Sequence, residues 1–452
     1  MDSIRSFQSY TPVSSGTEAA PRVEVPKNQE QVQQAGDQVS LGGDQKMPDA
    51  VKPHKKWLFM NYIAADCNLT DFQLRNIDQQ EMVGSDDNTH VVAYVDVGNQ
   101  KNIMGDWKDC RTYYVTKDDT PDKLNSELIE EHGATNMADP ATLTKFVVDA
   151  MGKFPADHVC LVLNDHGGGF TGAMSDDGAH AGAMSMPDMH KAISDAEKIT
   201  GKKIDIIGFD ACLMGETEVA YELKDDANIL MASEETENGP GWAYHTMLSG
   251  SNMAKAIETV QQSSLYKIDV GPEEFAKIVI DVNKENNGDI PTFSITDLTK
   301  MDEFKDALNS LAGTIRESDD KDSVKQAIKG AEYYGQGWSP YGDIRDVGHM
   351  CDNIIANAKD PKLVSSAKNV KASLAKTVMY NQVNDSQHPH SQGLSVYAPT
   401  NKPNDLGYNY ENLQFAKDTQ WDEMLKELGI GAPKGESPSI PDVWPDGSKR
   451  EN

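Results

Sequence analysis

Short apolar runs alternate with amphipathic segments between residues 57 and 232. The runs that predict strands are rich in aliphatic, β-branched and aromatic residues and lie at 57–63, 91–97, 111–115, 159–163, 204–209 and 229–232. Between them, 140–153 and 186–200 have helical spacing, and Asp139 followed by Pro140 is typical of a helix start. Thr70 is predicted to cap a further helix. Strands that alternate with helices predict a mostly parallel sheet covered by helices on both faces.

The pattern changes after residue 250, where helical spacing dominates. Helices are predicted at 252–266, 272–286, 300–316, 322–332 and 362–379, followed by one more strand at 393–399. Residues 1–54 are rich in Gln, Ser, Gly and Pro and predict a disordered arm or a pro-segment. The chain therefore divides into four parts: this arm, an α/β core (55–250), a largely helical C-terminal region (251–430) and a loose tail (431–452). The helical region contains the additional strand near 393–399.

Charge, hydropathy and cysteine content argue against several kinds of partner, membrane segment and scaffold. The 452-residue chain has a formal net charge of -30, which argues against nucleic acid and anionic membrane surfaces. No apolar run reaches the roughly 18 residues of a membrane span. The first residues lack the apolar centre of a signal peptide, and localisation stays unknown. The five cysteines are widely spaced without a Cys-x-x-Cys pair, so neither a disulfide scaffold nor a zinc ribbon is expected.

Two predicted strand ends carry the candidate chemistry. The strand at 159–163 leads to His166 and three glycines, and the strand at 204–209 leads to Cys212. Sites in open parallel sheets lie beyond the carboxyl ends of the strands, so adjacent strands would place both side chains together. The histidine can then act as base toward the thiol and as acid toward a leaving amine. A helix beginning after Cys212 would favour the thiolate through its dipole. The alternative is a small buried cysteine and a tight glycine turn.

Residues near this pair indicate a substrate pocket. Amide groups of the glycine turn at Gly167 can face a developing oxyanion. Asp210 can bind a guanidinium group or only cap a turn. Glu235 is a second pocket candidate, and Trp242 is either a pocket wall or a core residue. The residues alone leave these alternatives open.

Other motifs match less well. The His-Gly-Gly-Gly run at 166–169 occurs in lipase-type oxyanion turns, but the chain has no Gly-x-Ser-x-Gly nucleophile elbow. The glycines at 167–172 formally match a dinucleotide motif, but a loop rather than a helix follows them. The acidic stretch at 281–289 lacks the glycine spacing of an EF-hand loop. No metal ligands and no cofactor are therefore predicted, with calcium kept as the alternative.

Six stretches together resemble the clostripain family of cysteine peptidases, within the caspase-like clan that also includes gingipains. They are WLFMNYIAADCNL (57–69), NMADPATLT (136–144), PADHVCLVLNDHGGGF (155–170), DIIGFDACLMGETEVAYEL (205–223), SEETENGPGW (233–242) and QGLSVYAP (392–399). The resemblance implies a caspase-like α/β/α sandwich, with 55–250 as its catalytic core. It implies Cys212 as nucleophile and His166 as acid/base. It also implies an oxyanion hole from the amides of Gly167 and Cys212, and cleavage after Arg, less often Lys, with Asp210 at the basic pocket.

The prediction is thus a cysteine endopeptidase that cuts polypeptides after Arg or Lys and is a monomer. The alternative is a non-catalytic caspase-like protein for binding or scaffolding. Some relatives activate themselves by a cut after Lys or Arg in the loop between the dyad residues. The stretch 170–187 contains neither residue, so no cut is expected there. Relatives are usually exported, whereas no signal peptide is visible in this sequence.

Overall fold

The computed structural model describes residues 51–105, 107–176, 182–249, 270–286, 290–335, 344–384, 386–400 and 410–429. Several predictions lie outside these residues. They are the predicted helix at 252–266, the predicted tail, most of the predicted arm, and the part of the His166–Cys212 loop at 177–181.

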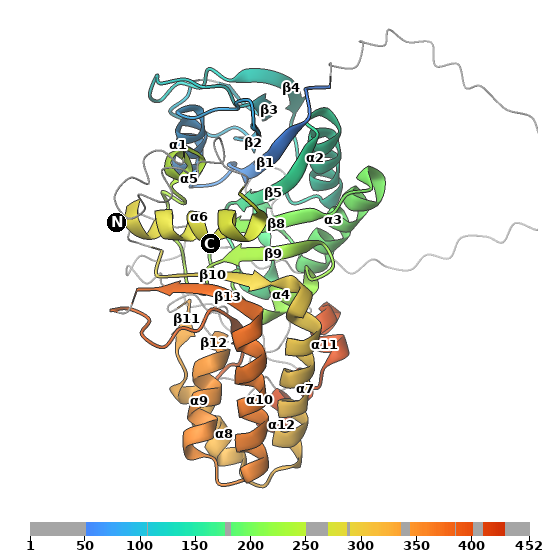
Figure 1. Cartoon of the computed structure of the whole chain (residues 1–452), viewed down its shortest axis with the longest axis vertical. Coiled ribbons are helices and arrows are strands. Elements are labelled where there is room, and N and C mark those ends of the chain that lie inside the picture. The colour runs from blue at the N-terminus through green and yellow to red at the C-terminus, as the bar shows by residue number, and fades with distance from the viewer. Residues whose placement is uncertain are drawn as a thin grey trace, which may run out of the picture.

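A nine-stranded sheet forms one half of the molecule, in the order β13-β10-β9-β8-β5-β1-β2-β3-β4 (Figure 1). Strands β9, β8, β5, β1 and β2 are parallel, and antiparallel strands flank them on both sides. The strands are β1 Lys55–Ala64, β2 Thr89–Asp96, β3 Cys110–Tyr114, β4 Glu127–Gly133, β5 Ala156–Asn164, β8 Ile204–Asp210, β9 Ala227–Ala232, β10 Thr292–Asp297 and β13 Val378–Val383. The predicted, mostly parallel sheet is confirmed.

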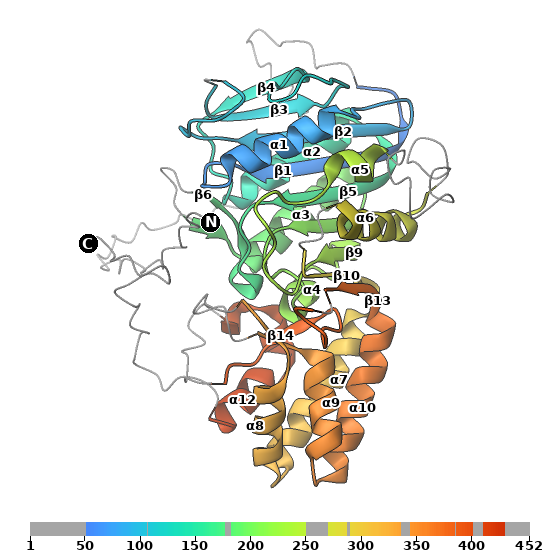
Figure 2. The same cartoon turned by 90° about the vertical axis from the view of Figure 1, so that its left-hand side faces the viewer.

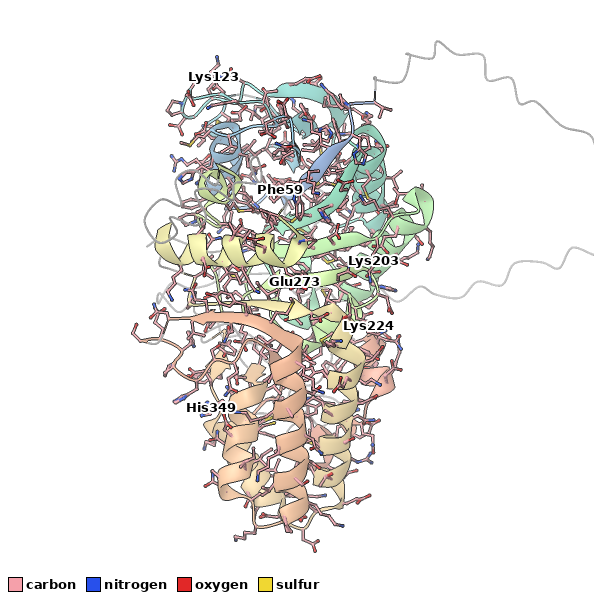
Figure 3. All side chains as sticks on the ribbon, in the orientation of Figure 1. Phe59, Lys123, Lys203, Lys224, Glu273 and His349 are labelled. Atoms are coloured by element: carbon pink, nitrogen blue, oxygen red, sulfur yellow. The ribbon has the colours of Figure 1, made fainter. Side chains whose placement is uncertain are left out.

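Helices cover both faces of this sheet, which gives the predicted α/β/α sandwich (Figure 2). Helices α1 (Thr70–Glu81), α5 (Tyr244–Ser249) and α6 (Pro272–Asn286) cover one face, and α2 (Pro140–Lys153), α3 (Met186–Thr200) and α4 (Thr217–Glu222) cover the other. Side chains alternate along β1, so Phe59 packs under the first group and Leu58 under the second. Phe59 lies inside the molecule, whereas Lys123 is exposed at its upper edge (Figure 3).

A helical region extends from the β13 edge of the sheet (Figures 1 and 2). It contains α7 (Met301–Glu317), α8 (Lys321–Gly330), α9 (Val347–Asn357), α10 (Pro361–Thr377), α11 (Gln414–Asp418) and α12 (Trp421–Glu427). A small antiparallel sheet of β11 (Tyr333–Tyr334), β12 (Ile344–Asp346) and β14 (Ser395–Tyr397) joins it to the core. None of the helices in the described part of the chain has the length and apolarity for a membrane span.

Two hydrogen bonds of Ser395 fix the small sheet to the core. The Ser395 amide nitrogen lies 3.0 Å from the Gly215 carbonyl oxygen, and the Ser395 hydroxyl donates to the same oxygen at 3.1 Å. Strands β10 and β13 come from the predicted helical region, yet they belong to the large sheet. The predicted boundary at residue 250 stays a prediction.

Several local predictions were wrong or incomplete. Thr70 is the first residue of α1 rather than its cap, because its hydroxyl donates to the carbonyl oxygens of Ala65 (2.7 Å) and Cys67 (2.6 Å). Strands β4, β10 and β13 and helix α9 were not predicted. Strand β4 (ELIEEHG) is charged and partly exposed, and β13 continues directly from α10, so neither shows the pattern of a separate buried strand.

Candidate active site

The carboxyl ends of β5 and β8 lie side by side, as predicted. The two strands are parallel, and their register pairs Asn164 with Asp210. The Asp165 amide also donates to the Asp210 carbonyl oxygen at 3.3 Å. His166 lies two residues after Asn164, and Cys212 lies two residues after Asp210. The two residues therefore leave the sheet at equivalent positions of adjacent strands.

Glycines allow the His166 turn to pack directly on the Cys212 turn. A Cβ atom on Gly167 would lie 2.2 Å from the Cys212 carbonyl oxygen and 3.1 Å from its amide nitrogen. Gly169 has a φ of +58°, and a Cβ there would lie 2.3 Å from Oε2 of Glu216. Larger residues at these two positions would force the turns apart.

The loop after β1 holds the imidazole of His166. Its Nε2 lies 2.7 Å from Oδ1 of Asn68. Because an amide oxygen only accepts, Nε2 carries the proton, and Nδ1 has the lone pair that a base requires. Burial lowers the pKa of His166 to about 4, so the ring is neutral at pH 7. Sequence reasoning missed Asn68, although it lies in the stretch 57–69 that carries the resemblance.

Cys212 is half-buried and contacts the backbone of Glu237. The Glu237 amide donates to Sγ at 3.3 Å, and Sγ lies 3.8 Å from the Glu237 carbonyl oxygen. Burial raises the pKa of Cys212 to about 12; that amide opposes the shift, and the carboxylates of Glu237, Glu235 and Asp210 reinforce it. The predicted help from a helix dipole was wrong, because α4 begins only at Thr217. The resting thiol is therefore protonated.

Asp210 is a buried carboxyl group at the end of β8. Its Oδ2 accepts hydrogen bonds from Tyr244 Oη (2.7 Å), Asn164 Nδ2 (2.8 Å) and the Trp242 amide (3.2 Å). Burial raises the pKa of Asp210 to about 6, although these donors favour its charged form. Gly241 packs against the carboxyl group, since a Cβ there would lie 2.7 Å from Oδ2.

Glu237 is a second acid beside Asp210, and sequence reasoning missed it. Its Oε2 accepts from the Trp242 indole nitrogen at 3.0 Å. Burial raises its pKa well above the usual range, and the neighbouring Asp210 adds to the shift. Within the described ranges, no Lys, Arg or His forms an ion pair with either acid. Among the residues that the structure describes, the site thus has two adjacent buried carboxyl groups and no cation.

Glu235 and Trp242, the other two predicted pocket residues, have surroundings that differ from those of Asp210. Oε1 of Glu235 accepts from the Gly335 amide at 2.9 Å, and its Oε2 lies 3.5 Å from His388 Nε2. Trp242 is 0% exposed and packs in the core, and it contacts the acidic pair through its indole nitrogen, which donates to Glu237, and its backbone amide, which donates to Asp210. The pocket roles of Glu235 and Trp242 stay predictions.

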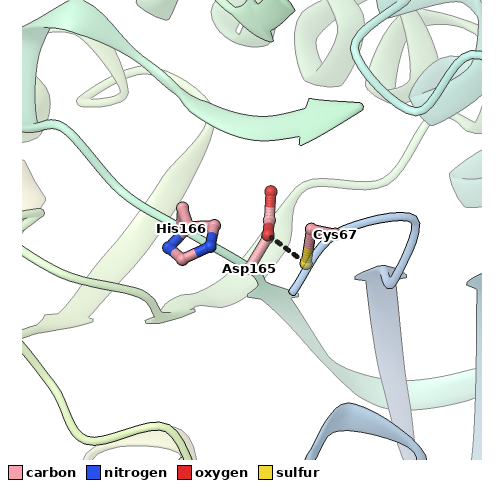
Figure 4. Close-up of side chains that lie close together, drawn as sticks. All are labelled: Cys67, Asp165 and His166. Carbon is pink, nitrogen blue, oxygen red and sulfur yellow. Dashed lines mark hydrogen bonds between the residues drawn. The ribbon is translucent and has the colours of Figure 1, made fainter. Parts of the chain in front are cut away.

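One group of side chains in the described part of the chain has the ligand types of a metal site. Single ligand atoms of Cys67, Asp165 and His166 lie within 4.8 Å of one another (Figure 4). No metal ligands were predicted from the sequence. Cys67 lies 98 residues before Asp165, so no local spacing connects the two residues. The predicted lack of a cofactor stays a prediction.

Comparison with known proteins gives consistent matches. The model of the clostripain family matches residues 61–428. Clostripain from Hathewaya histolytica is 23% identical over 407 residues, which cover 76% of this chain and 75% of that protein. A secreted C11 cysteine protease from Bacteroides thetaiotaomicron, solved with an irreversible peptide inhibitor, has a TM-score of 0.59 at 18% identity and covers 82% of this chain and 99% of its own.

A second solved structure, an inactive zymogen C11 protease from Parabacteroides distasonis, has a TM-score of 0.57 at 18% identity, with 82% and 99% of the two chains covered. These two likenesses confirm the fold. The family model covers most of the chain and favours an enzyme over the scaffold alternative, and polypeptides are its class of substrate. The chain belongs to the clostripain family of cysteine peptidases.

Proposed function

We propose that the protein is an endopeptidase that cuts after Arg or Lys, with Cys212 as nucleophile and His166 as acid/base. The acidic pair of Asp210 and Glu237 beside the cysteine supports this specificity. Two adjacent buried carboxyl groups cannot both ionise at little cost. A guanidinium group would pair with both and form charge-assisted hydrogen bonds, so a basic side chain completes this pocket.

The proposed reaction uses the geometry of the two turns. Nδ1 of His166 accepts the thiol proton as Sγ of Cys212 forms a bond to the substrate carbonyl carbon. The amides of Gly167 and Cys212 stabilise the oxyanion. The imidazolium then protonates the leaving amine, and water hydrolyses the thioester. Asn68 supports the imidazolium, because its Oδ1 accepts the hydrogen bond from Nε2.

Substrate binding and thiol activation are coupled through charge in this proposal. Asp210 and Glu237 hold the pKa of Cys212 high as long as they carry negative charge without a cation. A bound guanidinium group offsets that charge, so the thiolate becomes easier to form when a basic side chain is in place. The same two acids then select the substrate and activate the nucleophile.

The test of the proposed function compares two peptide amides that differ only in Arg or citrulline before the cleaved bond. Citrulline keeps the shape of Arg but is neutral. Loss of a buried charge pair costs about 2 to 5 kcal/mol, so kcat/KM for citrulline should be lower by a factor of about 30 to 5,000. Equal kcat/KM values for the two amides would show that the pocket does not distinguish a charged side chain from a neutral one of the same shape.

The pH dependence of Arg cleavage should follow Asp210. Its carboxyl group is neutral below its pKa of about 6 and then attracts the guanidinium group weakly. We expect kcat/KM for the Arg amide to rise as the pH increases through about 6. His166, with a pKa of about 4, is already neutral there. An activity that is constant through this range and falls only near the lower pKa would contradict the role of Asp210.

A further inference from the structure

Three side chains with metal-binding atoms meet at the ends of β1 and β5, and one of them, His166, belongs to the proposed dyad (Figure 4). We propose that Cys67, Asp165 and His166 bind one divalent transition-metal ion of the Zn²⁺ type, and that the bound ion inhibits the peptidase. The inhibitory part rests on the proposed role of His166 as acid/base. The binding site itself rests only on the three side chains.

Adjacent strands bring the three residues together. Strands β1 and β5 are parallel, and their register pairs Ile63 with Asn164. The loop after β1 carries Cys67, and its Sγ lies 3.4 Å from Oδ1 of Asp165. Ligands of a tetrahedral zinc ion with bonds of about 2.0 to 2.3 Å lie roughly 3.3 to 3.8 Å apart. The Cys67–Asp165 pair already has this separation, and the ligand atoms of all three residues lie within 4.8 Å of one another.

The Asp165 carboxylate is fixed in the orientation that a ligand needs. Its Oδ2 accepts from the amide (2.5 Å) and the hydroxyl (2.8 Å) of Ser175. This anchoring directs Oδ1 toward Cys67. Asp165 is 3% exposed, and within the described residues no Lys or Arg forms an ion pair with it. Partners that orient a ligand in this way strengthen metal sites, and a cation would offset the cost of burying this charge.

The ligand types determine the class of metal. A thiolate, an imidazole and a carboxylate suit Zn²⁺ and similar transition-metal ions, whereas Ca²⁺ and Mg²⁺ prefer sites made only of oxygen. On binding, the Cys67 thiol loses its proton to solvent as the sulfur–metal bond forms. Three protein ligands leave the fourth tetrahedral position for water.

Metal binding would inhibit by occupying the imidazole of His166. A ring held by a metal ion cannot turn to accept and return the Cys212 proton. The acidic pair of Asp210 and Glu237 is not part of this site, so the ion should lower kcat and leave KM for the Arg amide nearly unchanged. A chelator should restore the activity.

Co²⁺, a coloured substitute for Zn²⁺, tests the site on the full-length Cys212→Ala protein. We expect one Co²⁺ per chain, a sulfur-to-cobalt absorption band, and loss of that band when Zn²⁺ is added. Adding Cys67→Ala should weaken binding at least about 10-fold, while the control Cys351→Ala, in α9, leaves it unchanged. Absence of the band in Cys212→Ala would overturn the proposal, because all three proposed ligands are still present in that variant. Equal affinity with and without Cys67 would overturn it too.

The inhibitory part is tested on active protein with Asp165→Asn, which also serves if Cys67→Ala fails to fold. The Zn²⁺ concentration for half inhibition should rise at least about 10-fold in the variant. An unchanged concentration, or Zn²⁺ that binds without lowering kcat, would overturn the inhibition. If the wild type cleaves no Arg amide, the proposed function fails, and the Co²⁺ titration still decides whether the metal site exists.

Discussion

Replacing Cys212 by Ala should lower kcat for Arg-amide hydrolysis at least about 10⁴-fold, because the variant has no nucleophile to form the thioester. The fold should persist. Cys212 is only half-buried, and its Sγ hydrogen-bonds to the backbone of Glu237. Activity and thermal unfolding are measured on the same preparations.

Cys351→Ala is the matched control for this experiment. Cys351 is also a free cysteine, but it lies buried in α9, away from the carboxyl ends of β5 and β8. Its kcat should equal that of the wild type. Full activity in Cys212→Ala would place the nucleophile elsewhere.

Replacing Asp210 by Asn should have two opposite effects. The kcat/KM for the Arg amide should fall, because a desolvated guanidinium group loses its charged partner. The expected rise in activation free energy is about 2 to 5 kcal/mol. The reaction of Cys212 with iodoacetamide should become faster, because removing the nearby negative charge lowers the thiol pKa. The amide oxygen of Asn can still accept from Tyr244 and Asn164, so the fold should remain.

Glu237→Gln should change both rates in the same directions as Asp210→Asn. Glu235→Gln is the matched comparison in the same loop. The Glu235 carboxylate is held by the amide of Gly335 and lies near His388, so its removal should change Arg cleavage less. A larger loss of Arg cleavage in Glu235→Gln than in Glu237→Gln would show that Glu235, and not Glu237, is the second acid of the pocket. A loss of folding would also expose the thiol to iodoacetamide, so thermal unfolding is measured on the same variants and should match that of the wild type.

The sequence was most informative where buried strands end in polar residues. The apolar runs that became β5 and β8 are long enough to define parallel strands, and their ends placed His166 and Cys212 at one edge. The helix predicted to begin after Cys212 was wrong in position, because the chain first turns through Leu213, whose φ is +68°. Periodicity does not report such a turn, so the electrostatic argument for a thiolate failed with it.

The contacts that loop residues make in the site could not be predicted from the sequence. Three glutamates lie within 233–242, and periodicity gave no reason to prefer Glu237 to Glu235. The choice depends on how the turn places the Glu237 amide 3.3 Å from Sγ of Cys212. Asn68 and Cys67 meet His166 only because β1 is adjacent to β5 in the sheet. Such contacts follow from strand order, which the sequence pattern left open.

Covalent trapping tests the central claim most directly. The full-length wild-type protein is incubated with a peptide electrophile that ends in Arg and with its citrulline counterpart, and the modified peptide is identified by mass spectrometry. We predict one Arg-dependent adduct on Cys212, slower labelling by the citrulline reagent, and no such adduct in Cys212→Ala. An Arg-dependent adduct on Cys67 or another cysteine, or equal labelling by both reagents, would contradict the account.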